Sequence, residues 1–215
     1  MGKIKIALGQ HSINLILKDI RLNFKFFPKK LNVNAKKEYE FLKRIHKSKI
    51  PVPKPYSLIE TDNSSVLVRE FINGITFGEF LTRANVNELK SVLIKIVLIL
   101  KKLEELGIFV PEFSSLYKNV IVCNDVPYLI DLERGRFGAR SNVTQFLGFL
   151  IKLFHNPKLS KKLSEILNIE KLKSAAREYK TLRDISLVLQ AFVKTVNENV
   201  TNEHNRKLKK GCEEI

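Results

Sequence analysis

Short apolar runs interrupted by polar turns occupy the first part of the chain. Three of these runs have the two-residue period of half-buried strands, at residues 3–8, 13–18 and 22–27. They predict a three-stranded antiparallel meander. Two further apolar runs, at residues 57–60 and 65–71, are separated by a polar turn and predict two more strands. We therefore expect this part of the chain to form a five-stranded sheet.

Between these two groups of strands, the apolar positions change to a helical spacing. Tyr39, Leu42 and Ile45 fall on one face of a helix. We expect this helix to run from a cap at Asn34 to about Lys47. A proline-rich segment follows and ends it, because the residue before a proline disfavours helical backbone angles. One helix is therefore expected to accompany the sheet.

The composition changes near residue 72, where Gly74 and Gly78 separate the sheet-like part from a mostly helical remainder. We predict an α+β protein with two lobes. Residues 1–72 would form a small antiparallel five-stranded lobe with one helix. Residues 73–215 would form a mostly helical lobe that contains one hairpin.

The second lobe is expected to begin with a long helix. Asn85 and Glu88 have the spacing of a capping box, and Gly107 is a typical residue just after a helix end. Two apolar runs joined by an Asn-Asp turn then predict a hairpin across residues 119–131. From residue 142 onward the pattern is helical.

Composition is ordinary for a globular protein, with 44% apolar and 28% charged residues. The two cysteines, Cys123 and Cys212, are too few for a disulfide framework and indicate a reducing compartment. The longest apolar run, at residues 92–100, contains a lysine and is far shorter than the ~20 residues of a membrane span. We therefore expect a cytoplasmic protein with no membrane partner.

The charge is strongly basic, with 38 Lys and Arg against 22 Asp and Glu. Residues 1–50 hold 13 basic and 3 acidic residues, so the excess is concentrated at the N-terminal end of the chain. A basic surface attracts nucleic acid, the ribosome or acidic partners. A Lys-rich, Met-poor and Trp-free composition is also typical of a thermophilic source, and the sequence leaves both explanations open.

Two polar residues flank the predicted hairpin. Asn119 precedes its first strand, and Asp131 ends its second strand within the run YLIDLERG. A hairpin brings its outer ends together, so an amide oxygen and a carboxylate would lie close to each other. These are the oxygen ligands that Mg²⁺ or Mn²⁺ prefers, and they predict a metal site.

The order of sheet with helix, glycine-containing junction, long helix, and hairpin between an Asn and an Asp resembles the protein-kinase-like fold. Within it, residues 5–150 are most similar to the RIO-like atypical kinases and to a short archaeal family of predicted Ser/Thr protein kinases. The resemblance implies an enzyme that binds ATP with Mg²⁺ or Mn²⁺. It further implies transfer of the γ-phosphoryl group to Ser or Thr, chiefly on the protein itself or on a protein substrate.

The resemblance gives roles to residues of the first lobe. Lys25 would hold the α- and β-phosphates while Glu38 holds Lys25, and Lys18 is a rival for the same role. The segment from Gly9 to Ser12 would approach the phosphates, although taken alone it is better explained as a simple hairpin turn.

At the lobe junction, the backbone of Glu70 to Ile72 would bind the adenine edge, or would be an ordinary strand end. In the second lobe, the resemblance implies that Asn119 and Asp131 hold the metal ion.

The catalytic segment departs from the family pattern. The usual catalytic Asp lies five residues before the Asn, where this chain has Ser114, and the nearby acid is Glu112. Glu112 would orient the attacking hydroxyl, or would be an exposed loop acid in a degraded site. The second case describes a pseudokinase, a module that binds a nucleotide or a partner without catalysis.

The segment after Asp131 is short and basic. Arg134, Arg136 and Arg140 would bind a phosphate or an acidic partner, or would form a solvated loop. Thr144 is a candidate for self-phosphorylation. Because this segment is too short for a usual protein-substrate platform, a small-molecule kinase of the aminoglycoside phosphotransferase type is a further alternative.

Overall fold

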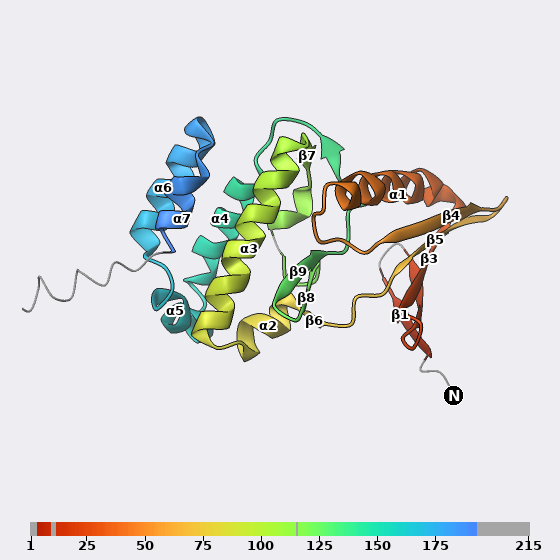
Figure 1. Ribbon diagram of the computed structural model, residues 1–215, viewed down its shortest axis with the longest axis horizontal. Helices are drawn as coiled ribbons and strands as arrows, with labels where there is room; N and C mark the ends of the chain where they lie inside the picture. The colour runs from red at the N-terminus through yellow and green to blue at the C-terminus, as the bar shows by residue number, and fades with distance from the viewer. Residues whose placement is uncertain (1–3, 10–11, 115, 193–215) are drawn as a thin grey trace, which may run out of the picture.

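The protein is described by a computed structural model that covers residues 4–9, 12–114 and 116–192 (Figure 1). A five-stranded antiparallel sheet with one long helix, α1, forms one end of the molecule, and most of the other helices gather at the opposite end. The predicted α+β fold is confirmed, with seven α-helices in the described residues. None of these helices has both the length and the hydrophobicity that crossing a membrane requires.

The sheet has the strand order β1-β2-β3-β5-β4. The predicted meander is formed by its first three strands, and the two later runs form the others. The strands are β1 Ile4–Leu8, β2 Ile13–Leu17, β3 Leu22–Pro28, β4 Pro55–Glu60 and β5 Ser64–Glu70. The central pair, β3 with β5, is held in register over seven residue pairs, from Leu22 opposite Glu70 to Pro28 opposite Ser64.

The two faces of the sheet differ in what covers them. Phe27 and Leu67 point inward, are fully buried and belong to the core that also includes α1. The opposite face is also apolar but open to solvent, with Ile6 65% and Leu8 81% exposed. Because side chains alternate along a strand, Lys25 lies on the inner face, opposite Phe24 and Phe26.

Helix α1 spans Asn32–Lys47, and the expected cap at Asn34 is wrong. A 3₁₀ turn at Lys29–Leu31 follows β3 and runs directly into the helix. Its N-cap residue is Leu31, which makes no side-chain cap. The helix therefore begins earlier than the polar pattern indicates, and Asn34 lies inside it.

The segment after the sheet was expected to be a junction, and it contains a strand and a helix. Strand β6 spans Ile75–Thr76 and helix α2 spans Phe77–Arg83. Thr76 and Glu79 form a complete capping box that starts α2. The predicted long helix is α3, Val86–Glu105, and Asn85 and Glu88 cap it as expected.

The predicted hairpin is formed by β8, Val120–Cys123, and β9, Val126–Leu129. Asn124 and Asp125 make the turn with φ angles of 49° and 57°, as a type I′ turn requires. Strand β6 pairs with β8, so the chain leaving the first sheet is joined to this hairpin. The 3₁₀ turn η2, Pro111–Ser114, precedes the hairpin. Two short strands, β7 Ile108–Phe109 and β10 Arg136–Phe137, also pair nearby.

Helices follow from residue 142 as expected. They are α4 Asn142–Leu153, α5 Pro157–Ser164, α6 Ile169–Leu182 and α7 Ile185–Gln190. Each begins at a side-chain cap, made in turn by Ser141, Asn156, Asn168 and Asp184. Their apolar faces join α3 and the hairpin in one core that reaches the sheet. Cys212 lies outside the described residues.

Candidate active site

A cleft of about 600 Å³ lies between the inner face of the sheet and the hairpin. It is lined by most of the residues to which the sequence assigns a role. These residues are Gly9, Ser12, Lys25, Glu70, Ile72, Glu112, Asn119 and Asp131. Glu38 is fully buried behind Lys25. The fold therefore brings the predicted site residues, which are up to 122 positions apart in the sequence, to a single cleft.

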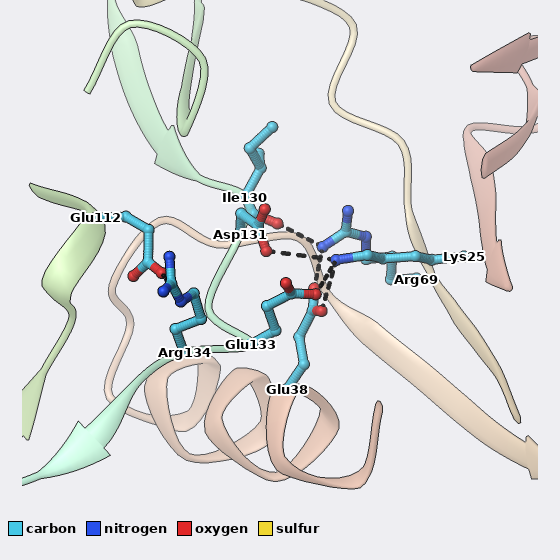
Figure 2. A network of polar contacts seen from close by, with 8 residues as sticks. All are labelled: Lys25, Glu38, Arg69, Glu112, Ile130, Asp131, Glu133 and Arg134. Carbon is cyan, nitrogen blue, oxygen red and sulfur yellow. Dashed lines mark hydrogen bonds and ion pairs between the residues drawn. The ribbon is translucent and has the colours of Figure 1, made fainter. Parts of the chain in front are cut away.

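Lys25 and Glu38 form a buried ion pair across the interface of β3 with α1 (Figure 2). The distance from Lys25 Nζ to Glu38 Oε2 is 2.8 Å. Burial alone would lower the pKa of Lys25, but the carboxylates of Glu38 and Asp131 outweigh it and raise the pKa above its ordinary value. Lys25 is therefore a charged ammonium group. Lys18, its rival, is exposed at the edge of the cleft.

Arg69 is a further member of this cluster that the sequence analysis did not identify. Its Nη1 atom donates to Glu38 Oε1 at 2.7 Å and to the backbone carbonyl of Ile130. The bond to Ile130 ties β5 and α1 to the segment that carries Asp131. One feature of the sequence could have identified Arg69, because it is a charged residue at an inward-facing position of a buried strand.

Asp131 follows β9 and reaches into the cleft, where 40% of its side chain is exposed. Its Oδ1 atom lies 3.4 Å from Lys25 Nζ. Glu133, two residues further on, places Oε2 at 3.5 Å from the same atom. One oxygen from each of Glu38, Asp131 and Glu133 lies within 4.8 Å of the others. Hard oxygen atoms clustered in this way fit a divalent cation such as Mg²⁺.

Asn119 lies beside this cluster because of the hairpin geometry. Its carbonyl accepts a hydrogen bond from the Ile130 N–H at 3.0 Å. Asn119 is thereby held next to the residue that precedes Asp131, and both Asn119 and Asp131 line the cleft. The amide side chain of Asn119 adds an oxygen that suits the same kind of cation.

Glu112 lies in η2 on another part of the cleft wall. Both of its carboxylate oxygens are buried, and Arg134 Nε lies 3.3 Å from Oε1. Desolvation raises the pKa of Glu112, and the nearby Arg134 opposes this effect only in part. The expectation of an exposed loop acid is therefore wrong. Ser114, at the position of the usual catalytic acid, ends the same 3₁₀ turn.

Gly9 and Ser12 bond to each other between β1 and β2. The Gly9 N–H donates to the Ser12 carbonyl at 2.8 Å, so this donor already has a partner. A Cβ atom at Gly9 would lie 3.2 Å from that carbonyl oxygen. Both residues line the cleft, and residues 10 and 11 lie outside the described residues.

The last residue of β5 and the two residues after it differ in whether their backbone N–H groups are bonded. The N–H groups of Glu70 and Phe71 donate to the carbonyls of Lys54 and Arg21, at 2.9 and 2.8 Å. Among the described residues, no backbone bond uses the N–H of Ile72. Of these three residues, Ile72 is therefore the one whose N–H makes no backbone bond.

The arginines after Asp131 have separate positions. Arg134 pairs with Glu112, whereas the guanidinium groups of Arg136 and Arg140 lie over the Phe109 ring, 5.1 and 5.8 Å from its centre. Thr144 lies in the first turn of α4, and its hydroxyl is buried with no hydrogen-bond partner in the part of the chain that the structure describes. That hydroxyl is inaccessible to a phosphate donor in this conformation.

Comparisons with known structures show the same fold. In the co-crystal structure of WbdD with the kinase inhibitor LY294002, the match has a TM-score of 0.61 and 18% identity, and it covers 86% of this chain. This chain spans only 43% of that longer chain. The aminoglycoside phosphotransferase APH(3'')-Id from Streptomyces rimosus gives a TM-score of 0.59 at 11% identity, with 83% of this chain and 86% of that chain covered.

Comparisons of sequence give the family. A search of curated protein sequences finds no match. The family model of the RIO domain matches residues 21–135, which is more than half of the chain. The matched region begins before β3 and ends after Glu133, so it includes the whole Lys25 cluster and both ends of the hairpin. The chain therefore belongs to the RIO-domain family of atypical kinases.

Proposed function

We propose that the protein binds ATP with Mg²⁺ or Mn²⁺ in this cleft and transfers the γ-phosphoryl group to Ser or Thr hydroxyls, chiefly of its own chain. The observation that carries the proposal is the buried Lys25–Glu38 ion pair, whose ammonium also faces Asp131. Phosphoryl transfer depends on positioning and on neutralising phosphate charge. A fixed ammonium group beside a half-exposed carboxylate supplies both positioning and charge neutralisation at one point of the cleft.

The nucleotide would lie along the cleft wall formed by the sheet. The free N–H of Ile72 suits the adenine edge, and Lys25 would bind the α- and β-phosphates. Glu38 holds Lys25 in place and is itself held by Arg69, so the ammonium has little freedom to reorient. This preorganisation lowers the cost of binding the phosphates.

A divalent cation, when bound, would bridge phosphate oxygens and neutralise charge on the transferred group. Asp131 would supply a carboxylate ligand and Asn119 an amide oxygen. The bond between the Ile130 N–H and the Asn119 carbonyl supports their use at one site. Glu133 lies close enough to Asp131 to add a further carboxylate.

Glu112 would orient the attacking hydroxyl. Its carboxylate is buried and has no hydrogen-bond partner among the residues that the structure describes, so an incoming hydroxyl would satisfy it. Its raised pKa brings it closer to neutral pH, where a proton acceptor is most effective. Arg134 would keep Glu112 ionised and in place.

A small-molecule kinase is a second candidate, and the shortness of one segment favours it. Only residues 132–141 separate Asp131 from α4, which leaves little chain for a platform that holds a protein substrate. The fold match to an aminoglycoside phosphotransferase is consistent with a small substrate. The basic sheet would in either case allow association with RNA or the ribosome.

The test is incubation of the pure protein with γ-labelled ATP and either Mg²⁺ or Mn²⁺. One series contains the protein alone, one a generic protein acceptor, and one a panel of aminoglycosides. Label on the chain or on the acceptor, mapped by mass spectrometry to Ser or Thr, is the expected result. Label on a small molecule alone would support the second candidate.

Binding of nucleotide without any transfer would identify a pseudokinase. Asp131→Asn is the matched control, because it keeps the shape of the side chain and removes the charge. Transfer that persists in this variant would exclude the proposed site as its origin.

A further inference from the structure

Glu133 is a buried acid that lies beside both the proposed metal site and the lysine of the cleft. It is 8% exposed and follows Asp131 by two residues. Its Oε2 atom lies 3.5 Å from Lys25 Nζ. Figure 2 shows Glu38, Asp131 and Glu133 pointing toward the Lys25 ammonium group. Among the described residues, Lys25 is the only cation within ion-pair distance of Glu133.

The number of donors on Lys25 matches the number of acids around it. An ammonium group has three N–H donors and no acceptor. Glu38, Asp131 and Glu133 lie 2.8, 3.4 and 3.5 Å from Nζ, so each takes one donor. Phosphate oxygens that bind Lys25 would therefore compete with Asp131 and Glu133 for its donors.

The charge balance makes that displacement unfavourable without a cation. Three carboxylates face two cationic side chains, Lys25 and Arg69, so the cluster carries one net negative charge. A carboxylate released from Lys25 would face an anionic phosphate inside a partly buried cleft, where repulsion is strong. A divalent cation that binds Asp131 and Glu133 would have two effects at once. It would remove this repulsion, and it would release Lys25 from these two carboxylates.

We propose that Glu133 is a positioning residue that makes nucleotide binding depend on a divalent cation. In the cation-free cleft it holds Lys25 and repels phosphate. With the cation bound, the negative charge of Glu133 is neutralised by the cation, and Lys25 is available to the nucleotide. This inference rests on the proposed nucleotide site.

The experiment measures ADP affinity by calorimetry, with excess Mg²⁺ and with EDTA, on the full chain. Wild type should bind ADP more tightly with Mg²⁺, by a factor in the range of about 5 to 150 that is typical of coupled sites. Glu133→Gln should bind ADP in EDTA about tenfold more tightly than wild type does. Its affinity in Mg²⁺ should change less, so the coupling factor falls.

Two variants serve as controls. Glu133→Asp keeps the charge and should retain a larger coupling factor than Glu133→Gln. Glu60→Gln removes an acid that pairs with Lys36 on the surface, and should leave both affinities unchanged. Thermal unfolding of each variant verifies that it is folded, and Glu133→Ala replaces Glu133→Gln if the latter does not fold.

The inference is overturned if Glu133→Gln changes both affinities by the same factor, or changes neither, while wild type binds Mg²⁺-ADP. Either result would make Glu133 a structural residue only. Failure of wild type to bind ADP in Mg²⁺ would instead overturn the proposed function, on which the inference depends. The two failures are therefore distinguishable in one set of titrations.

Discussion

Lys25 Nζ lies 2.8 Å from Glu38 Oε2, and this buried ion pair joins the central strand of the sheet to helix α1. The same ammonium faces the cleft, where it lies 3.4 Å from Asp131 Oδ1. One side chain therefore serves both the packing of α1 against the sheet and the proposed phosphate contact. Mutations at this position are expected to affect stability and ligand binding together.

The first prediction concerns Lys25→Met. The substitution leaves Glu38 with Arg69 as its remaining partner and increases the net negative charge of the cluster. We expect a loss of roughly 3 kcal/mol in the free energy of unfolding, as for a broken buried pair. Binding of nucleotide should be lost in the variant at temperatures where it remains folded. Chemical denaturation and calorimetry measure the two effects.

Lys18→Met is the matched control for this prediction. Lys18 is exposed at the edge of the cleft, so its removal should change the free energy of unfolding by less than about 0.5 kcal/mol. If Lys18→Met abolishes nucleotide binding and Lys25→Met does not, the role assigned to Lys25 is wrong.

The second prediction is stabilisation by ligand. ADP with Mg²⁺ at about 100 times its dissociation constant should add ~2.7 kcal/mol to the free energy of unfolding, provided that only the folded state binds. Thermal unfolding with and without the ligand measures this shift. No shift at millimolar nucleotide would contradict the proposed nucleotide site.

The third prediction concerns Asp131→Asn. The amide keeps the size of the side chain but is a weaker ligand for a hard cation. Phosphoryl transfer should nearly vanish, while ADP binding in EDTA is retained or strengthened because a negative charge is removed. Transfer assays and calorimetry separate the two effects. Wild-type transfer rates in this variant would remove Asp131 from the metal site.

The fourth prediction is a pH dependence governed by Glu112. Desolvation raises its pKa above the ordinary Glu value of about 4.3, and only the ionised carboxylate can accept the proton of the attacking hydroxyl. The transfer rate should therefore rise with pH through this raised pKa. Glu112→Gln should remove this rise of the rate with pH and lower the rate by roughly 10² to 10⁴.

The contribution of Glu112 to the free energy of unfolding should fall as pH rises, whereas the transfer rate should increase. In the native state Glu112 binds its proton more tightly than in the unfolded state, because its native pKa is the higher one. The wild-type free energy of unfolding should therefore fall, relative to Glu112→Gln, as pH rises from about 4.3 through the raised pKa. A difference that does not vary with pH would show that Glu112 is not desolvated in solution.

Periodicity and capping patterns were sufficient to predict much of the fold. The five strands, the long helix beginning at Asn85 and the hairpin turn at Asn124 depend on local sequence, and all three predictions are confirmed. Helix α2 was missed because Gly74 and Gly78 indicated a junction, although Thr76 and Glu79 have the spacing of a capping box.

The site was only partly predictable, because its cluster depends on contacts between distant segments. Lys25 and Glu38 could be paired through the family resemblance. Arg69 and Glu133 could not, because their partners come from strands and helices far away in the sequence. Burial of the Glu112 carboxylate likewise depends on how η2 packs in three dimensions.

Gly74 limits how the two ends of the molecule can move relative to each other. A Cβ atom at this position would lie 2.3 Å from the carbonyl oxygen of Val122, so only glycine allows the connecting chain to lie against β8. Ile75 and Thr76 then pair with Val122 and Ile121 of the hairpin, whereas the Phe71 N–H is bonded to the Arg21 carbonyl on the side of the sheet. Ile72 and Asn73 are therefore the part of this connection at which a rotation of the sheet relative to the hairpin would occur. The proposed adenine contact at Ile72 would then lie at the pivot, and opening would have to break the bond from Arg69 to the Ile130 carbonyl next to Asp131.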